Sequence, residues 1–169
     1  LVMRNAARPD LTFTASAATG INRDQGFLAT DVGRLLRFQG GDGAWREYEI
    51  RTRISATQVT ARLKGEPLLD LKGTTQWRLG YWSETTGWPM VGDFFEDRLW
   101  LAGSIEAPDL ICGSVTGSYE EFKQTDSQGE VLDDNALALR LNSRKMSRIM
   151  WLSSDTRGML IGTGSEEYT

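Results

Sequence analysis

The side chains best suited to chemistry are the acidic ones between residues 126 and 135. Asp126 and Glu130 lie close to the run Asp133–Asn135. Oxygen ligands of this kind bind Ca²⁺, and paired carboxylates can act as general acid and base. The spacing does not fit the calcium loop of an EF-hand, and no glycine occupies the turn position that such a loop requires. We therefore interpret the run as a solvated turn before a strand over residues 136–141.

Two other segments resemble functional loops but lack required residues. In Ser153–Gly158 the order resembles the Asp-box turn of sialidase-type propellers, with the glycine one residue too far from Asp155 and no aromatic residue at the expected place. Such turns are structural in any case. Gly40–Gly43 is rich in glycine, but no helix and no Lys-Ser/Thr pair follow it, so the sequence does not predict a phosphate loop.

Aromatic and basic side chains offer two further binding surfaces. Trp45, Trp82 and Trp88 could bind sugar, although nothing polar converges on them in sequence and packing is favoured. Six arginines of the first half could form a basic strip for an anionic ligand: Arg34, Arg37, Arg46, Arg51, Arg53 and Arg62. Arginine is common on the wet face of a sheet, so a solvated surface is the favoured interpretation.

The chain has no histidine and a single cysteine, Cys112. The usual zinc sites, the commonest general base and the Ser/His and Cys/His pairs are therefore excluded. No internal disulfide can form, and the apolar run Leu110–Cys112 predicts a buried thiol in a chain suited to a reducing compartment. We expect no catalytic, cofactor-binding or metal-binding residue, no cofactor, and no enzymatic activity.

Charge is unevenly distributed along the 169 residues. Residues 1–87 carry 12 Lys/Arg against 9 Asp/Glu, a net +3, whereas residues 88–169 carry 7 against 14, a net −7. An acidic half argues against broad binding of duplex DNA, which requires many cations. No apolar run approaches the ~18 residues that span a bilayer, so a membrane partner is not expected.

The elements that must position these residues are strands. In the first half, alternating segments over residues 34–38, 45–51, 58–63 and 75–79 are separated by turns, including one at Asp31–Gly33. Alternation predicts a sheet that is wet on one face, hence a small β-barrel or sandwich over residues 1–86. The inward side chains are expected to be Leu36, Phe38, Tyr48, Ile50, Val59, Ala61, Leu63, Trp77 and Leu79.

Small and turn-forming residues over Ser83–Pro89 predict a boundary, after which the pattern changes. Residues 87–169 contain short, continuous apolar runs, typical of strands covered on both faces. Two such units, 98–122 and 148–168, match at offsets of 50 and 49 residues. This is the period of a propeller blade, although two β-hairpins can also resemble each other by chance. Two blades cannot close a ring, and the chain begins at Leu1 rather than Met, so we expect a fragment of a larger all-β protein.

Several segments resemble one protein family. These are Ala29–Arg37, Arg78–Ser83, Gly87–Pro89, Phe94–Ser104, Pro108–Ser114, Gly117–Phe122, Asp133–Ala136, Ile149–Leu152 and Leu160–Glu166. The pattern is similar to the tail nozzle, or tail tubular protein B-like, family of short-tailed phages. The chain departs from it at Glu167-Tyr168, where a tryptophan is expected directly after the glutamate.

The resemblance implies a structural virion protein, made in the host cytoplasm, that forms a homo-oligomeric ring at the end of a tail. Its partners would be other copies of itself, neighbouring tail proteins, and DNA that passes without specific binding. The acidic second half is consistent with a channel wall that repels DNA. The alternative is a carbohydrate-binding module or glycosidase on a propeller scaffold, which would need carboxylates and an aromatic platform in one pocket.

Overall fold

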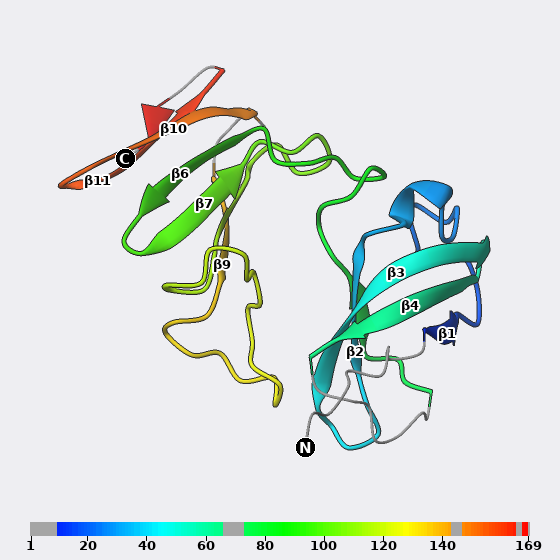
Figure 1. Ribbon diagram of the computed structural model, residues 1–169. Helices are drawn as coiled ribbons and strands as arrows, with labels where there is room; N and C mark the ends of the chain where they lie inside the picture. The colour runs from blue at the N-terminus through cyan, green and yellow to red at the C-terminus, as the bar shows by residue number, and fades with distance from the viewer. Residues whose placement is uncertain (1–9, 66–72, 143–146, 165–166, 169) are drawn as a thin grey trace, which may run out of the picture. The chain divides into compact units, whose positions relative to one another are not determined.

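The computed structural model describes residues 10–65, 73–142, 147–164 and 167–168. Across these residues the chain forms antiparallel β-sheets joined by turns and loops, with one short 3₁₀ turn, η1, at Ala29–Asp31 (Figure 1). The predicted all-β class is confirmed. No helix in this part of the chain is long and apolar enough to cross a membrane. The chain divides into two compact units, Leu1–Thr85 and Thr86–Thr169.

The first unit contains one five-stranded sheet in the order β1-β4-β3-β2-β5. Its strands are β1 Leu11–Thr14, β2 Leu35–Gln39, β3 Trp45–Ser55, β4 Gln58–Lys64 and β5 Trp77–Leu79. The sequence left open a barrel or a sandwich. The described strands form neither, because β1 and β5 lie at opposite edges and no second sheet covers the first. Ile21 and Phe27, from the loop between β1 and β2, pack on the apolar face instead.

The alternation predicted for these strands is confirmed. Leu36, Tyr48, Ile50, Val59 and Ala61 are buried, and the other predicted inward residues pack against them. Side chains in register across antiparallel strands share a face, so each correct assignment fixes its neighbour. The Tyr48 hydroxyl is buried without a hydrogen-bond partner among the described residues, and desolvation raises its pKa.

The second unit contains two sheets, each of strands that follow one another in sequence. The first consists of β6 Val91–Phe95, β7 Arg98–Ala102, β8 Leu110–Gly113 and β9 Leu137–Arg140. The second consists of β10 Ile149–Asp155, β11 Gly158–Thr163 and β12 Glu167–Tyr168. Ser165 and Glu166, near the end of the second predicted repeat, lie outside the described residues.

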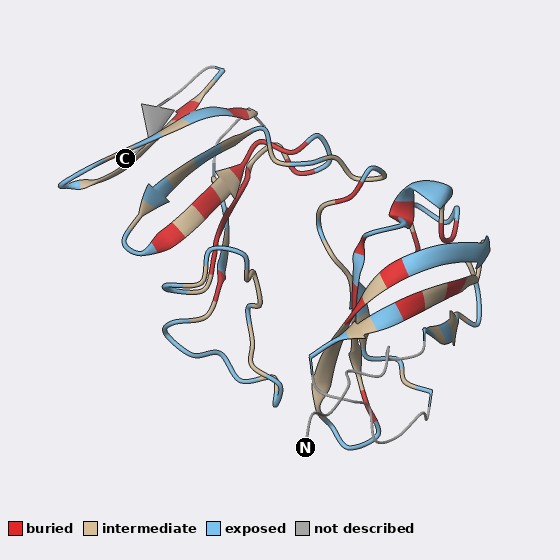
Figure 2. Ribbon diagram, in the orientation of Figure 1, coloured by how far each residue is buried: buried red, intermediate tan, exposed pale blue. Residues whose placement is uncertain are grey.

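The predicted burial of the apolar runs on both faces holds for β8, is only partial for β7 and β11, and is wrong for β10. All four residues of β8 are buried. In β10, by contrast, Met150 is 54% exposed and Trp151 is 39% exposed. Figure 2 colours most of this strand as exposed or intermediate. The two sheets pack through one face each, so the far side of β10 is covered by neither.

The first prediction compares neighbouring residues of β3. Ile50→Ala should destabilise the fold by roughly 2–5 kcal/mol, because it leaves a cavity in the first core. Arg51→Ala should cost less than about 0.5 kcal/mol, because Arg51 is exposed. Urea denaturation followed by circular dichroism measures both. A larger cost for Arg51→Ala would contradict the assignment of faces.

Candidate functional site

The acidic residues around 126–135 do not converge. The side chains of Asp133 and Asp134 are exposed, and Asp126 Oδ1 accepts hydrogen bonds from the backbone N–H groups of Gln128 and Glu130 at 2.8 and 2.9 Å. Within the described ranges, no group of three or more His, Cys, Asp or Glu side chains could hold a metal ion. The segment is a turn before β9, as interpreted from the sequence.

The backbone of this turn has a partner that the sequence did not reveal. The buried guanidinium of Arg98 donates from Nη1 to the carbonyl of Ser114 at 2.5 Å and of Asn135 at 2.7 Å. Its Nη2 donates to the carbonyl of Asp133 at 2.9 Å. Arg98 therefore anchors the long β8–β9 loop to the start of β7. Carbonyl groups carry no mark in a sequence, so this contact could not be foreseen.

The two loops that resemble functional motifs are both hairpin turns. Asp155 Oδ1 accepts hydrogen bonds from the N–H groups of Arg157 at 2.6 Å and Gly158 at 3.2 Å. In the β2–β3 turn, Arg46 donates to both carboxylate oxygens of Asp42, at 2.9 and 2.6 Å. The hydrogen bonds from Arg46 are the main reason that the pKa of Asp42 falls to about 2.

The six arginines do not form one basic strip. Arg46 is in register with Phe38 and Arg53 with Val59, so both lie on the apolar side of the sheet. Arg34 is buried. The remaining three lie on the solvent side or are exposed, where Glu47 and Glu49 interrupt the positive charge: Arg37, Arg51 and Arg62.

The predicted aromatic candidates are also separated. The Arg37 and Arg78 guanidinium carbons each lie 5.3 Å from the centre of the Trp45 ring. This arrangement gives cation–π contacts to an indole that a sugar would otherwise stack upon. Trp88 lies in the other unit and is exposed. Trp45 and Trp82 belong to the first unit and Trp88 to the second, so the three tryptophans do not share a platform within one unit.

Cys112 is buried, as predicted. Burial raises the pKa of its thiol to about 11. The thiol is therefore protonated at neutral pH and has little nucleophilic character.

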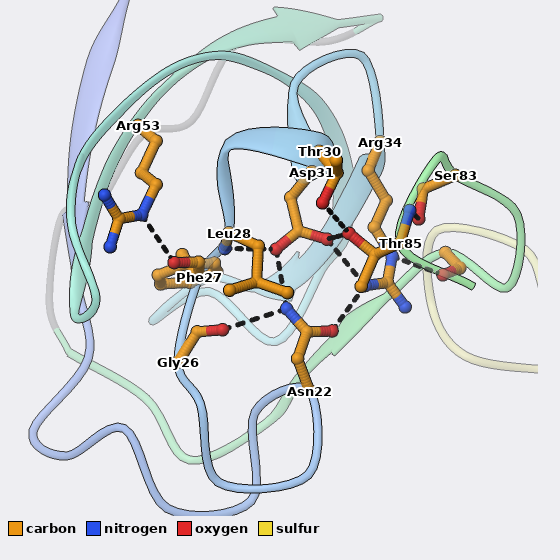
Figure 3. Close-up of polar contacts among 11 residues, drawn as sticks. Asn22, Gly26, Phe27, Leu28, Thr30, Asp31, Arg34, Arg53, Ser83 and Thr85 are labelled. Atoms are coloured by element: carbon orange, nitrogen blue, oxygen red, sulfur yellow. Dashed lines mark hydrogen bonds and ion pairs between the residues drawn. The ribbon is translucent and has the colours of Figure 1, made fainter.

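The carboxylate of Asp31 is buried and accepts four hydrogen bonds (Figure 3). Its Oδ1 accepts from Arg34 Nη1 at 2.9 Å and from Thr85 Oγ1 at 2.8 Å. Its Oδ2 accepts from Asn22 Nδ2 at 2.6 Å and from the Leu28 N–H at 2.8 Å. Each oxygen thus has two donors, which compensates for the loss of water around a buried charge. We call these five residues the Asp31 node.

The cation of the node, Arg34, has two hydrogen-bond partners besides Asp31. Arg34 Nε donates to the Gly80 carbonyl at 2.8 Å, and Nη1 also donates to Asn22 Oδ1 at 2.8 Å. The Thr85 hydroxyl has one proton, which it gives to Asp31, so at the 2.8 Å contact with Thr30 it must act as acceptor. The node therefore ties the η1 region to the chain after β5.

Asn22 reaches the node from a strained turn. Asn22, Arg23 and Asp24 have φ values of 46°, 56° and 69°, in the left-handed region. This conformation costs about 1–2 kcal/mol for each such residue. The Gly20 N–H donates to Asp24 Oδ1 at 2.7 Å, and Asn22 Nδ2 donates to the Gly26 carbonyl at 2.9 Å, which helps to offset the cost. The side-chain contacts of Asn22 therefore depend on an unfavourable backbone conformation.

The hydrogen bonds that the Asp31 carboxylate already accepts decide whether the Asp31 node can act as a base or bind a metal. A general base needs a lone pair directed at its substrate, and a metal ligand needs one directed at the ion. The four donors around Asp31 occupy both carboxylate oxygens, and the group is buried. The node therefore acts on the fold. The sequence placed a turn at Asp31–Gly33 but did not identify Asp31 as buried. The available signal was Arg34, three residues after an aspartate and next to an apolar strand.

A second carboxylate joins the two sheets of the second unit. Asp93, in β6, accepts from the Ser154 N–H of β10 at 2.7 Å through Oδ2 and from its neighbour Phe94 N–H at 2.9 Å through Oδ1. Ser154 Oγ donates in return to the Phe94 carbonyl at 3.1 Å. Hydrogen bonding from Ser154, and then from the Phe94 N–H, lowers the pKa of Asp93.

In the second unit, the strands that are equivalent in the two sheets differ from the strands that the sequence repeat aligned. The sequence matched the β7–β8 region with β10–β11. In the structure β7 is the second strand of its sheet and β10 the first, so the equivalent hairpins are β6–β7 and β10–β11. Each closes on a two-residue turn, after the pairs Phe95↔Arg98 and Asp155↔Gly158. The structural offset between the turns is therefore 60 residues.

The sequence similarity at the shorter offset has its own cause. Trp100 lies opposite Gly113, and Trp151 lies opposite Gly162. A Cβ atom on Gly113 would lie 3.0 Å from the Trp100 ring, and one on Gly162 would lie 1.9 Å from the Trp151 ring. Each glycine is thus the surface on which an indole rests. The same cross-strand pair occurs at non-equivalent positions of the two sheets.

The second prediction concerns the Asp31 node. Asp31→Ala should destabilise by roughly 3–5 kcal/mol, because it leaves the Arg34 guanidinium buried without its carboxylate. The double variant Asp31→Leu, Arg34→Met should be less destabilised than the single one, since no buried charge remains uncompensated. Asp10→Ala, which breaks the exposed pair with Arg62, should cost less than about 1 kcal/mol. Equal unfolding midpoints for Asp31→Ala and Asp10→Ala would disprove this role.

The third prediction is a pH dependence in the second unit. Because the folded pKa of Asp93 is depressed, its stabilising contribution is present above the unfolded pKa and is lost as the pH falls through the folded value. Asp93→Ala should lower the melting temperature at pH 7 and flatten the decline of stability in acid. Asp133→Ala removes an exposed carboxylate and serves as the control of equal charge. An unchanged acid decline in Asp93→Ala would refute the prediction.

No protein-family model matches the chain. No curated protein matches it either.

Proposed function

We propose that this chain is a structural subunit of a homo-oligomeric phage tail nozzle, through which DNA leaves the virion. The observation that carries the proposal is the apolar surface of the second unit. Of the fifteen exposed large hydrophobic side chains among the described residues, eleven lie within residues 86–169. Exposed apolar side chains that gather into a patch are typical of surfaces that pack against another protein, and this uneven distribution supports such a surface on the second unit. An assembly subunit needs such a surface.

The segments that resemble the nozzle family contribute directly to this surface. Gly87–Pro89 and Phe94–Ser104 flank or form the β6–β7 hairpin, where Trp88 and Phe94 are exposed. Phe94 also makes an edge contact with Tyr119, with ring centres 5.1 Å apart. Trp88, Phe94 and Tyr119 thus all lie in segments of the resemblance, and all three side chains are exposed.

The sheets of the second unit support a propeller-like interpretation. A four-stranded antiparallel sheet whose strands follow in sequence is the architecture of a propeller blade. The second sheet starts with an equivalent hairpin and packs against the first. The net charge of −7 over residues 88–169 would repel DNA and so favour sliding over binding.

The fourth prediction tests assembly. The natural protein should form closed rings in negative-stain images, and Phe94→Asp should reduce ring formation by placing a charge on the proposed contact surface. Ile54→Asp is the matched control, because Ile54 is 52% exposed and Phe94 59% exposed, and Ile54 belongs to the first unit. A protein that stays monomeric at all concentrations would refute the proposal.

A glycan array separates the alternative function. Specific glycan binding that Trp45→Ala abolishes, together with an absence of rings, would favour a carbohydrate-binding module. Hydrolysis of a polysaccharide lost in Asp133→Asn, Asp134→Asn would favour a glycosidase.

A further inference from the structure

The side of β10–β11 that faces away from the first sheet of the second unit forms a distinct surface. It contains Trp151, Ser153, Leu160 and Gly162, and we call it the Trp151 face. The opposite side carries Leu152, Met159 and Ile161, which pack into the core shared with the first sheet. Trp151 is 39% exposed although its ring rests on Gly162. A large aromatic side chain is thus positioned on a flat strand surface and left accessible.

Register identifies the counterpart of this face in the first sheet. Counting back from the closing pairs Phe95↔Arg98 and Asp155↔Gly158, Val91 corresponds to Trp151. Counting forward, Trp100 corresponds to Leu160 and Ala102 to Gly162. The Trp151 face of the second sheet is therefore equivalent to the face of the first sheet that carries Val91, Trp100 and Ala102.

That counterpart is covered within the chain. Trp100 and Ala102 are buried, and Val91 packs with them against Leu152 and Ile161 of the second sheet. The contact joins the face of the first sheet that carries Val91, Trp100 and Ala102 to the side of the second sheet that is not its equivalent. Such a contact is heterologous: it leaves on the second sheet the same kind of face that the first has just buried.

From this geometry we propose that the Trp151 face docks a further β-sheet of the same repeat. The occupant presents aliphatic side chains at alternate positions of a two-residue hairpin, as β10–β11 does with Leu152, Met159 and Ile161. Ser153 stands where the first sheet has Asp93, the acceptor for the Ser154 N–H. The docked contact therefore depends on apolar packing against Trp151 and Leu160, without the carboxylate link. The inference rests on the repeat of the sheets and not on the assignment to a tail.

The test offers the occupant in trans to the whole chain. The probe is a backbone-cyclised peptide of residues 149–163 with Trp151→Thr and Leu160→Thr, so that the side chains of Leu152, Met159 and Ile161 lie on its apolar face and the opposite face is polar. Circular dichroism verifies that the probe is folded, because isolated hairpins are marginally stable. ¹⁵N-labelled chain is titrated with the probe, and the Trp151 indole resonance, assigned with Trp151→Phe, is followed. We expect this resonance to shift saturably.

Two variants of the chain locate the contact. Ser153→Arg places a charged side chain on the exposed centre of the Trp151 face, where Ser153 has no packing role, and should weaken binding by about tenfold or more. Ser127→Arg makes the same change in an exposed loop of the same unit and should leave binding unchanged. Joining the probe to the chain through a flexible linker raises its effective concentration, so a weak contact still raises the melting temperature.

Three outcomes would overturn the proposal. One is a folded probe that shifts no Trp151 resonance in trans and does not raise the melting temperature when linked. Another is binding that Ser153→Arg leaves intact, which would place the contact elsewhere. The last is self-association of the chain that Ser153→Arg abolishes, because the occupant would then be a second copy of this chain.

Discussion

The first unit depends on a buried ion pair between Asp31 and Arg34. Among the described residues no second sheet covers the apolar face of its sheet, and the loop between β1 and β2 does so instead. Backbone hydrogen bonds such as Phe27 N–H to the Ala56 carbonyl hold this loop, and the pair adds side-chain contacts that reach the turn at Asn22, the η1 region and Thr85. Ile21 and Phe27 can then act as core residues although neither belongs to a strand. A costly buried charge thus replaces a layer of secondary structure.

Local pattern was enough to predict most of the strands, and the inward faces of those in the first unit, but β1 and β6 were not predicted. Alternation over β2, β3 and β4 is a property of consecutive residues, and each side chain's face follows from its neighbour. An error of one residue would have moved Tyr48 of β3, or Val59 of β4, to the wet face together with every other inward residue of its strand. The assignment of faces is therefore right or wrong for each strand as a whole. The alternation broke down only where β3 has bulges, which returned Arg53 to the side of Val59.

The contacts that hold loops in place could not be predicted in the same way. Arg98 donates to backbone carbonyls as far as 37 residues away in the sequence, and Asp31 accepts a hydrogen bond from a hydroxyl 54 residues away. Neither partner set has a pattern along the chain. The alignment of the repeat failed for a related reason: the Trp–Gly pairs of the two sheets are alike in sequence and lie on different strands. Similar local packing was mistaken for equivalent topology.

Head-to-tail contact between the two sheets gives the second unit a direction. A stack built by such contacts has two unlike ends. Each added sheet covers the exposed face of the previous sheet and exposes an equivalent face of its own. Growth of this kind has no natural limit, so it must be stopped by curvature that returns the last layer to the first or by a terminal layer with a polar outer side. If a further sheet docks on the Trp151 face as proposed, the outer side of that sheet determines whether the stack becomes a closed body or a fibre.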